Sequence, residues 1–207
     1  GKTTLIAQIM GGLKPDSGLI EFDGTDITSF TTELRAQAGL GRTFQISQLA
    51  MDQTVLQNVV LGTVGERRGV WKFWRPVLAV QELRERAMES LSDVGLADKA
   101  ATPVSELSHG GRRQLEVAIA LTLNPKAFVM DEPMAGLGSD GSKKMTIFLD
   151  NLRTRAPILL VEHDMEAVFA LSDRISVLVS GMVIATGSVD QIRNDARVRK
   201  AYLGEDS

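Results

Sequence analysis

Two acidic residues follow a short apolar run in the second half of the chain, where they could act on a bound ligand. The run is Ala-Phe-Val-Met at 127–130, and Asp131 and Glu132 come directly after it. Such a run between turn signals is typical of a strand buried in a parallel sheet. In open α/β sheets ligands bind at the carboxyl ends of the strands. The acid pair is therefore a candidate site, although an isolated pair before Pro133 is more often part of a turn.

A second stretch favours the binding of an anion at the start of a helix. Ser108 can cap a helix that begins near Arg112. Gly110 and Gly111 let a ligand approach the backbone closely, and the N–H groups and dipole of a helix start attract anions. Arg112 and Arg113 oppose that dipole, which is expected only beside an anion or an acidic neighbour.

The opening tetrapeptide, Gly1-Lys2-Thr3-Thr4, is a third candidate. Gly-Lys-Thr ends the phosphate loop G-x-x-x-x-G-K-[ST], which precedes a helix, and a helix over 3–10 is predicted here. The first glycine of the loop and the strand before it are missing. We therefore expect the sequence to begin inside its own phosphate loop and this polypeptide alone to bind ATP poorly. By itself the tetrapeptide is weak evidence, since such sequences occur by chance.

The segments around these candidates predict an α/β fold. Strands are expected at 19–22, 40–45, 127–130 and 157–161, and a closing hairpin at 175–179 and 183–185. Further helices are expected at 55–61, 76–94, 139–153 and 165–171. Thr54 is expected to start the helix at 55–61, Ser139 or Asp140 to cap the helix that ends near 153, and Asp164 to cap the helix at 165–171.

Together these segments resemble the nucleotide-binding cassettes of ABC-type ATPases. Residues 107–111 (Leu-Ser-His-Gly-Gly) resemble the signature motif, and 128–133 resembles the Walker B segment. Gln45 matches the family's Q-loop and His163 its switch histidine. Each motif is common alone. Their order along the chain, from phosphate loop to histidine, makes chance a poor explanation.

The resemblance implies a P-loop NTPase core with a mainly parallel sheet, plus a helical subdomain. It makes residues 1–207 a single ABC ATPase domain. Residues 1–48 and 125–207 would form the catalytic core. Residues 49–124 would form the helical subdomain that carries the signature motif.

The resemblance also assigns roles in Mg²⁺-dependent ATP hydrolysis. Glu132 would be the general base that polarises water, and His163 and Gln45 would be the other catalytic residues. ATP would be contacted by the motif residues Gly1, Lys2, Thr3, Thr4, Gln45, Ser108, Gly110, Gly111 and His163. Mg²⁺ would be held by Thr3, Gln45 and Asp131.

Three positions depart from the family pattern. The signature motif has His109 where a second glycine is usual and Gly111 where glutamine is usual. In the loop after Glu132, Gly138 replaces a customary aspartate. Gly138 has no side chain with which to make the cross-subunit hydrogen bonds of that aspartate.

Composition limits the choice of partners. The chain is 43% hydrophobic and 24% charged, as ordinary globular domains are, and its net charge of −3 predicts no bulk attraction to nucleic acid or anionic lipid. It has no cysteine, which excludes a disulfide framework and a thiolate metal site. No apolar run approaches the roughly 18 residues of a spanning helix. We expect any connection to a membrane to be made through a partner.

The resemblance implies what those partners are. A second ABC ATPase subunit, identical or different, would bind head to tail and complete the ATP site with Ser108 and Gly110. Transmembrane permease subunits would hold the pair at the cytoplasmic face of the inner membrane. An insertion at 65–75 and the end at 201–205 resemble ATPase subunits of branched-chain amino acid importers. The basic and aromatic residues at 65–75 could contact a partner or a membrane surface, or could fold back on a neighbouring helix.

The expected function is therefore to power import of branched-chain amino acids or related solutes. An ATPase of lipid or lipopolysaccharide export remains the alternative within transport. A chromosome-maintenance ATPase would carry a long coiled-coil insertion between the phosphate loop and the signature motif, and this region is too short for one. A translation-linked ABC protein would carry two cassettes in one chain, and only one is seen. A non-catalytic interaction module stays open because the phosphate loop is incomplete.

Overall fold

A computed structural model describes residues 1–42, 49–66 and 81–202 of the 207-residue chain. The strands are β1 Glu21–Phe22, β2 Thr25–Asp26, β3 Leu40–Arg42, β4 Ala127–Asp131, β5 Ile158–Val161, β6 Ile175–Val179 and β7 Met182–Gly187. The helices are α1 Lys2–Ile9, α2 Thr32–Ala38, α3 Val55–Glu66, α4 Gln81–Asp93, α5 His109–Leu121, α6 Gly138–Leu152, α7 Met165–Leu171, α8 Val189–Asn194 and α9 Ala196–Tyr202.

The central sheet is parallel, and β4 lies in its middle. β3 and β5 pair with β4 on either side, with Phe128 of β4 opposite Gly41 and Ile158. Phe128, Val129 and Met130 are at most 2% exposed, as a strand covered on both faces must be. The prediction of a central parallel strand that ends in two acids is confirmed.

Two antiparallel hairpins accompany this sheet, β1 with β2 and β6 with β7. Each turns on a dipeptide whose residues both have positive φ, Asp23-Gly24 (51° and 72°) and Ser180-Gly181 (49° and 84°). Such turns match the twist of the strands that they join. The closing hairpin around Ser180-Gly181 is confirmed.

Side-chain caps fix several helix starts. Thr54 Oγ1 accepts from the Gln57 amide at 3.2 Å, and the Gln57 side chain accepts from the Thr54 amide at 2.7 Å, a reciprocal capping box. Asp164 Oδ1 accepts from two amides at the start of α7. The Asp164 cap was predicted, as was the start of a helix at Thr54. The prediction that Ser139 or Asp140 caps α6 is wrong, because the helix begins at Gly138 and both lie inside its first turn.

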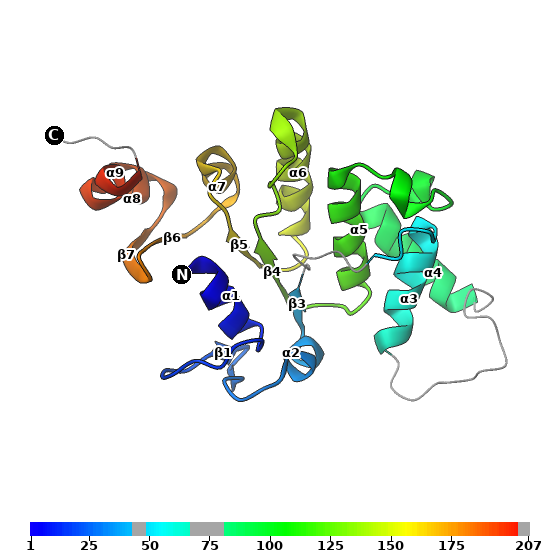
Figure 1. Cartoon of the computed structure of the whole chain (residues 1–207), viewed down its shortest axis with the longest axis horizontal. Coiled ribbons are helices and arrows are strands. Elements are labelled where there is room, and N and C mark those ends of the chain that lie inside the picture. Colours follow the sequence, from blue (N-terminus) through cyan, green and yellow to red (C-terminus); the bar gives the residue numbers. More distant parts are fainter. Residues whose placement is uncertain (43–48, 67–80, 203–207) are drawn as a thin grey trace.

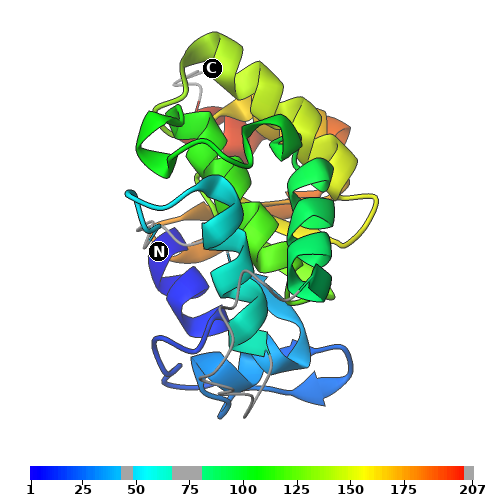
Figure 2. The ribbon, with the colours of Figure 1, turned by 90° about the vertical axis from the view of Figure 1, so that its right-hand side faces the viewer.

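Packing divides the apolar residues among three clusters. The largest joins α3, α4 and α5 to β4 and α6. A second lies between α1, β3 and β4, and a third between the β6–β7 hairpin and the C-terminal helices. Figure 1 shows α1 on one side of the sheet strands and α3 to α5 on the other. Figure 2 views the molecule from the side of α3 and α4.

A buried arginine fastens α2 to the end of α1. Arg35 is 1% exposed. Its Nη1 donates to the carbonyls of Gln8 and Ile9, both at 2.5 Å, in the last turn of α1. Its Nη2 donates to Thr28 O at 3.0 Å and its Nε to Phe30 O at 3.1 Å. The guanidinium thereby satisfies carbonyls at the negative end of the helix dipole.

Some predictions fall on residues outside the described ranges. Gln45 and most of the 65–75 insertion are among them, as is most of 201–205. The division into a catalytic core and a helical subdomain over 49–124 stays a prediction. Within the described ranges, no helix combines the length and the hydropathy of a membrane span.

Candidate functional site

The ends of β4 and β5 bring the acid pair and the predicted switch histidine together. Asp131 pairs with Val161, the last residue of β5, so the residues that follow the two strands are neighbours. The ladder continues one step further, since the Glu132 amide donates to Val161 O at 2.8 Å. Glu132 therefore begins its loop at a position fixed by the sheet.

Glu132 has an unusual backbone. Its φ is +48°, in the left-handed region where a side chain other than glycine is strained by about 1–3 kcal/mol. A turn follows it, in which Ala135 N donates to Glu132 O at 3.1 Å and Leu137 N to Met134 O at 3.2 Å. Strain held in place by surrounding hydrogen bonds is characteristic of functional residues.

Lys2 reaches the same place from α1. Its Nζ lies 3.9 Å from Oε1 of Glu132, and both side chains are 38% exposed. An ion pair this long and this exposed contributes little to stability, so an incoming anion can draw the lysine away. Lys2 and Glu132, which are 130 positions apart in the sequence, therefore lie on one side of the molecule.

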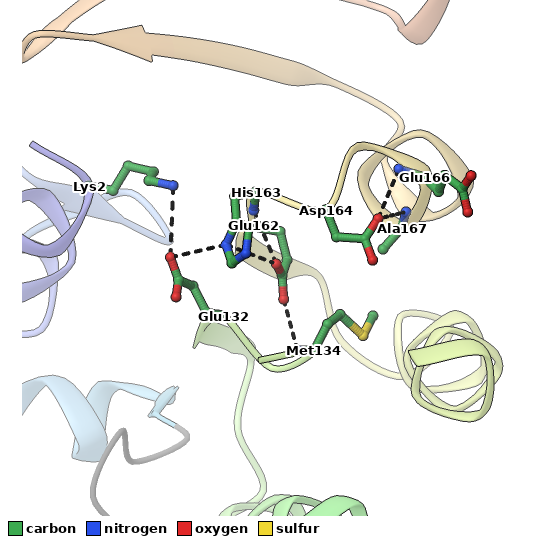
Figure 3. A network of polar contacts seen from close by, with 8 residues as sticks. All are labelled: Lys2, Glu132, Met134, Glu162, His163, Asp164, Glu166 and Ala167. Atoms are coloured by element: carbon green, nitrogen blue, oxygen red, sulfur yellow. Dashed lines mark hydrogen bonds and ion pairs between the residues drawn. The ribbon is translucent and has the colours of Figure 1, made fainter. Parts of the chain in front are cut away.

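His163 completes the cluster, as Figure 3 shows. Its Nδ1 lies 3.4 Å from Oε1 of Glu132 and 3.9 Å from Oε2 of Glu162. The imidazole is 63% exposed and can meet a ligand. A cleft of about 950 Å³ adjoins the cluster and is lined in part by Lys2, Glu162 and His163.

The start of α1 offers N–H groups to an anion. The first backbone hydrogen bond of this helix joins Leu5 N to Gly1 O at 3.0 Å, and Gly1 makes no side-chain cap. The amides of the first turn therefore have no partner within the helix. Gly1, Thr3 and Thr4 are exposed. This arrangement suits a phosphate group, with Lys2 as the nearby cation.

Hard oxygen donors for a metal ion are also present. Thr3 supplies a hydroxyl from α1, and Asp131 a carboxylate from the end of β4, which α1 contacts. Among the described residues no group of three His, Cys, Asp or Glu side chains could hold a metal. Mg²⁺ does not need one, since it is usually bound by one or two protein oxygens, phosphates and water. The donor set fits Mg²⁺ bound together with a phosphate ligand.

The signature residues lie elsewhere. Ser108 caps α5, its Oγ accepting from the Gly111 amide at 3.2 Å. This cap was predicted, but the helix begins at His109 rather than near Arg112, because the residue after an N-cap is already helical. In Figure 1, α5 lies beyond β3 and α6 from α1. Ser108, Gly110 and Gly111 do not join the cluster around Lys2.

One of the two arginines of α5, Arg113, has the acidic neighbour that we expected. Arg113 Nη1 lies 3.0 Å from Oε2 of Glu116, one turn further along the helix and nearly buried. Arg112 Nη2 donates to Ser105 O at 3.0 Å. These contacts compensate for the unfavourable position of both cations at a helix start.

One member of the cluster was not predicted. Glu162 stands between the end of β5 and His163, and its side chain is 0% exposed. Its Oε1 accepts from the Met134 amide at 2.8 Å and its Oε2 from the His163 amide at 3.1 Å. The sequence signal was an acid directly after an apolar strand segment, the same signal that identified Asp131 and Glu132.

Comparison with known families agrees with this geometry. The model of the ABC transporter family matches residues 1–135. A second model, of branched-chain amino acid ATP-binding cassette transporters, matches residues 182–207. The first match covers the start of α1, the signature residues and the acid pair.

Individual relatives extend the match to the whole chain. The high-affinity branched-chain amino acid transport ATP-binding protein LivG of Escherichia coli K12 is 34% identical, over 99% of this chain and 83% of LivG. The lipopolysaccharide export system ATP-binding protein LptB of Haemophilus influenzae is 32% identical, over 99% of this chain and 82% of LptB.

Solved structures share the fold. The ADP conformation of MJ1267, an ATP-binding cassette of an ABC transporter, superposes with a TM-score of 0.85 at 31% identity, over 99% of this chain and 84% of that one. A dimeric post-hydrolysis state of the cassette MJ0796, bound to ADP and Pi, superposes with a TM-score of 0.73 at 26% identity, over 91% and 81%. The predicted α/β fold of a P-loop NTPase is confirmed, and the chain belongs to the ABC transporter family as one of its ATP-binding cassettes.

Proposed function

We propose that this chain is the ATP-hydrolysing subunit of an ABC transporter that imports branched-chain amino acids or related solutes. The observation that carries the proposal is that Lys2, Glu132 and His163, which come from three separate segments, lie together. Oε1 of Glu132 is 3.9 Å from the Lys2 ammonium and 3.4 Å from Nδ1 of His163. A cation, a carboxylate and an imidazole beside a helix start are the groups that phosphoryl transfer to water needs.

The ion pair between Lys2 and Glu132 is the resting arrangement of this site. When ATP binds, the first-turn amides of α1 and the Lys2 ammonium take its β- and γ-phosphates. Release of Lys2 leaves the Glu132 carboxylate free to accept a hydrogen bond from water and to act as general base. Because the pair is 3.9 Å apart and both side chains are partly exposed, breaking it costs little free energy.

His163 and the metal ligands act on the same phosphate. The imidazole, beside Glu132 and largely exposed, is placed to contact the γ-phosphate and to respond to its loss. Thr3 and Asp131 would hold Mg²⁺, with Gln45 as a third ligand, and the ion would neutralise charge on the phosphates.

A second copy of the cassette would complete the site. Helix α5, whose start carries Ser108 and Gly110, lies across the sheet strands from α1 in Figure 1, so these residues would serve a nucleotide on another subunit. A Cβ added at Gly110 would come no closer than 3.8 Å to its neighbours within this chain. The glycine is thus not required by packing inside the subunit, which suits a surface approached by an external ligand. Closure on ATP and release after hydrolysis would then be transmitted to permease subunits.

The identity of the transported solute is the most specific part of the proposal. LivG and the model matched by residues 182–207 both refer to branched-chain amino acid transport, and they favour import of such solutes. LptB makes lipopolysaccharide export the second candidate. In either case we place the subunit at the cytoplasmic face of the inner membrane, bound to its permease.

A transport assay separates the two candidates. The full-length subunit, reconstituted with its cognate permease and binding protein in liposomes, should drive leucine uptake that depends on ATP and Mg²⁺. The same transporter carrying Glu132→Gln should bind ATP without uptake. ATP hydrolysis that supports no uptake of branched-chain amino acids would refute the import assignment and leave the ATPase intact.

A further inference from the structure

The Glu162 carboxylate is buried between two loops of the site. Its side chain is 0% exposed, and burying a carboxylate is costly unless hydrogen bonds compensate for the lost water. Two backbone amides do so, Met134 N at Oε1 and His163 N at Oε2. Figure 3 shows the carboxylate between them.

These two amides belong to the loops that carry the proposed base and the switch histidine. Met134 follows Glu132 by two residues and lies in the turn that Glu132 opens. His163 directly follows Glu162. One rigid carboxylate therefore joins the loop after β4 to the loop after β5.

We propose that Glu162 is a positioning residue that fixes Glu132 and His163 relative to one another for hydrolysis. This inference rests on the proposed ATPase function. Glu132 needs such support because its φ of +48° is strained and relaxation would move its carboxylate. The sheet restrains it on one side through Val161 O at 2.8 Å, and Glu162 restrains the turn on the other.

The consequence for catalysis is specific. Displacing a catalytic group by about 1 Å can cost about 10²-fold in rate, whereas binding of ATP depends mainly on α1. Loss of the hydrogen bonds that Glu162 accepts from Met134 and His163 should therefore lower kcat and leave the KM for ATP nearly unchanged.

The test compares two isosteric variants of the full-length ATPase. In Glu162→Gln one oxygen still accepts, but the amide nitrogen faces a backbone N–H that it cannot satisfy. We expect kcat to fall about tenfold or more, with KM for ATP within about twofold. Glu166→Gln is the matched control, since this carboxylate is exposed in the first turn of α7, and its kcat should equal that of wild type.

Combination with Glu132→Gln distinguishes positioning from general damage. If Glu162 acts by positioning Glu132 against His163, the combined loss in the double variant should be smaller than the product of the two single losses, while independent effects would multiply. Independently of any variant, the Met134 amide of the wild type should be protected from hydrogen exchange.

Each failure has a separate meaning. Wild-type kcat in Glu162→Gln, multiplied losses in the double variant, or rapid exchange at Met134 would overturn the positioning role. A wild-type protein that hydrolyses no ATP would instead overturn the proposed function.

Discussion

Replacing Arg35 with methionine removes a buried cation from four backbone carbonyls. Two of these, Gln8 O and Ile9 O, end α1, and the others, Thr28 O and Phe30 O, precede α2. At about 1 kcal/mol for each acceptor left without this donor, the lower end of the usual cost, the loss is about 4 kcal/mol. Methionine restores some apolar packing, so we expect a net loss of about 3 kcal/mol in the free energy of unfolding.

Urea and thermal unfolding followed by circular dichroism measure this loss. For a chain of this size 3 kcal/mol corresponds to a Tm lower by roughly 6–12 °C. Arg35→Lys should fall between wild type and Arg35→Met, because one ammonium cannot reach all four carbonyls. Arg84→Met, on the exposed face of α4, should stay within about 0.5 kcal/mol of wild type. If Arg35→Met also has the Tm of the wild type, the carbonyls do not depend on the guanidinium and the reasoning is wrong.

Three further predictions concern single residues. Glu132→Gln should retain ATP binding in the full-length protein and nearly abolish hydrolysis; turnover at the wild-type rate would remove Glu132 as the base. Ser108→Ala should lose about 1 kcal/mol of stability with its cap and lower hydrolysis by the dimer while leaving ATP binding to the monomer unchanged; normal hydrolysis would contradict a cross-subunit role. Hydrogen bonds from Arg197 lower the pKa of Asp195 to about 2, so its carboxylate favours the folded state above the unfolded pKa of about 3.9, and this contribution is lost as pH falls toward 2. Asp195→Asn should therefore flatten the pH dependence of Tm between about pH 4 and pH 2, and an unchanged slope would count against the assignment.

Much of the site could be predicted because it lies at the ends of parallel strands. Residues 127–131 and 158–161 are apolar runs that end in acids, and parallel neighbours place such ends at one sheet edge. The meeting of Glu132 and His163 follows from that rule. Their contact with Lys2 does not, because it depends on how α1 packs against β4.

What could not be predicted depends on the burial of single side chains and on backbone angles. Glu162 and Glu132 are both glutamates after apolar runs, yet one side chain is 0% exposed and the other 38%. The sequence carries no sign of that difference, which is set by the turn at Met134. Likewise Ser139 and Asp140 are good capping residues, but the N-cap position is taken by Leu137, two residues before Ser139.

The left-handed backbone at Glu132 has a consequence for engineering. Glycine adopts that conformation without strain, so Glu132→Gly should make the fold more resistant to heat while removing the acid on which turnover depends. A selection that scores only thermal resistance would favour inactive proteins at this position. Selection of a more thermostable variant of this ATPase therefore requires that each round of screening also measure ATP hydrolysis.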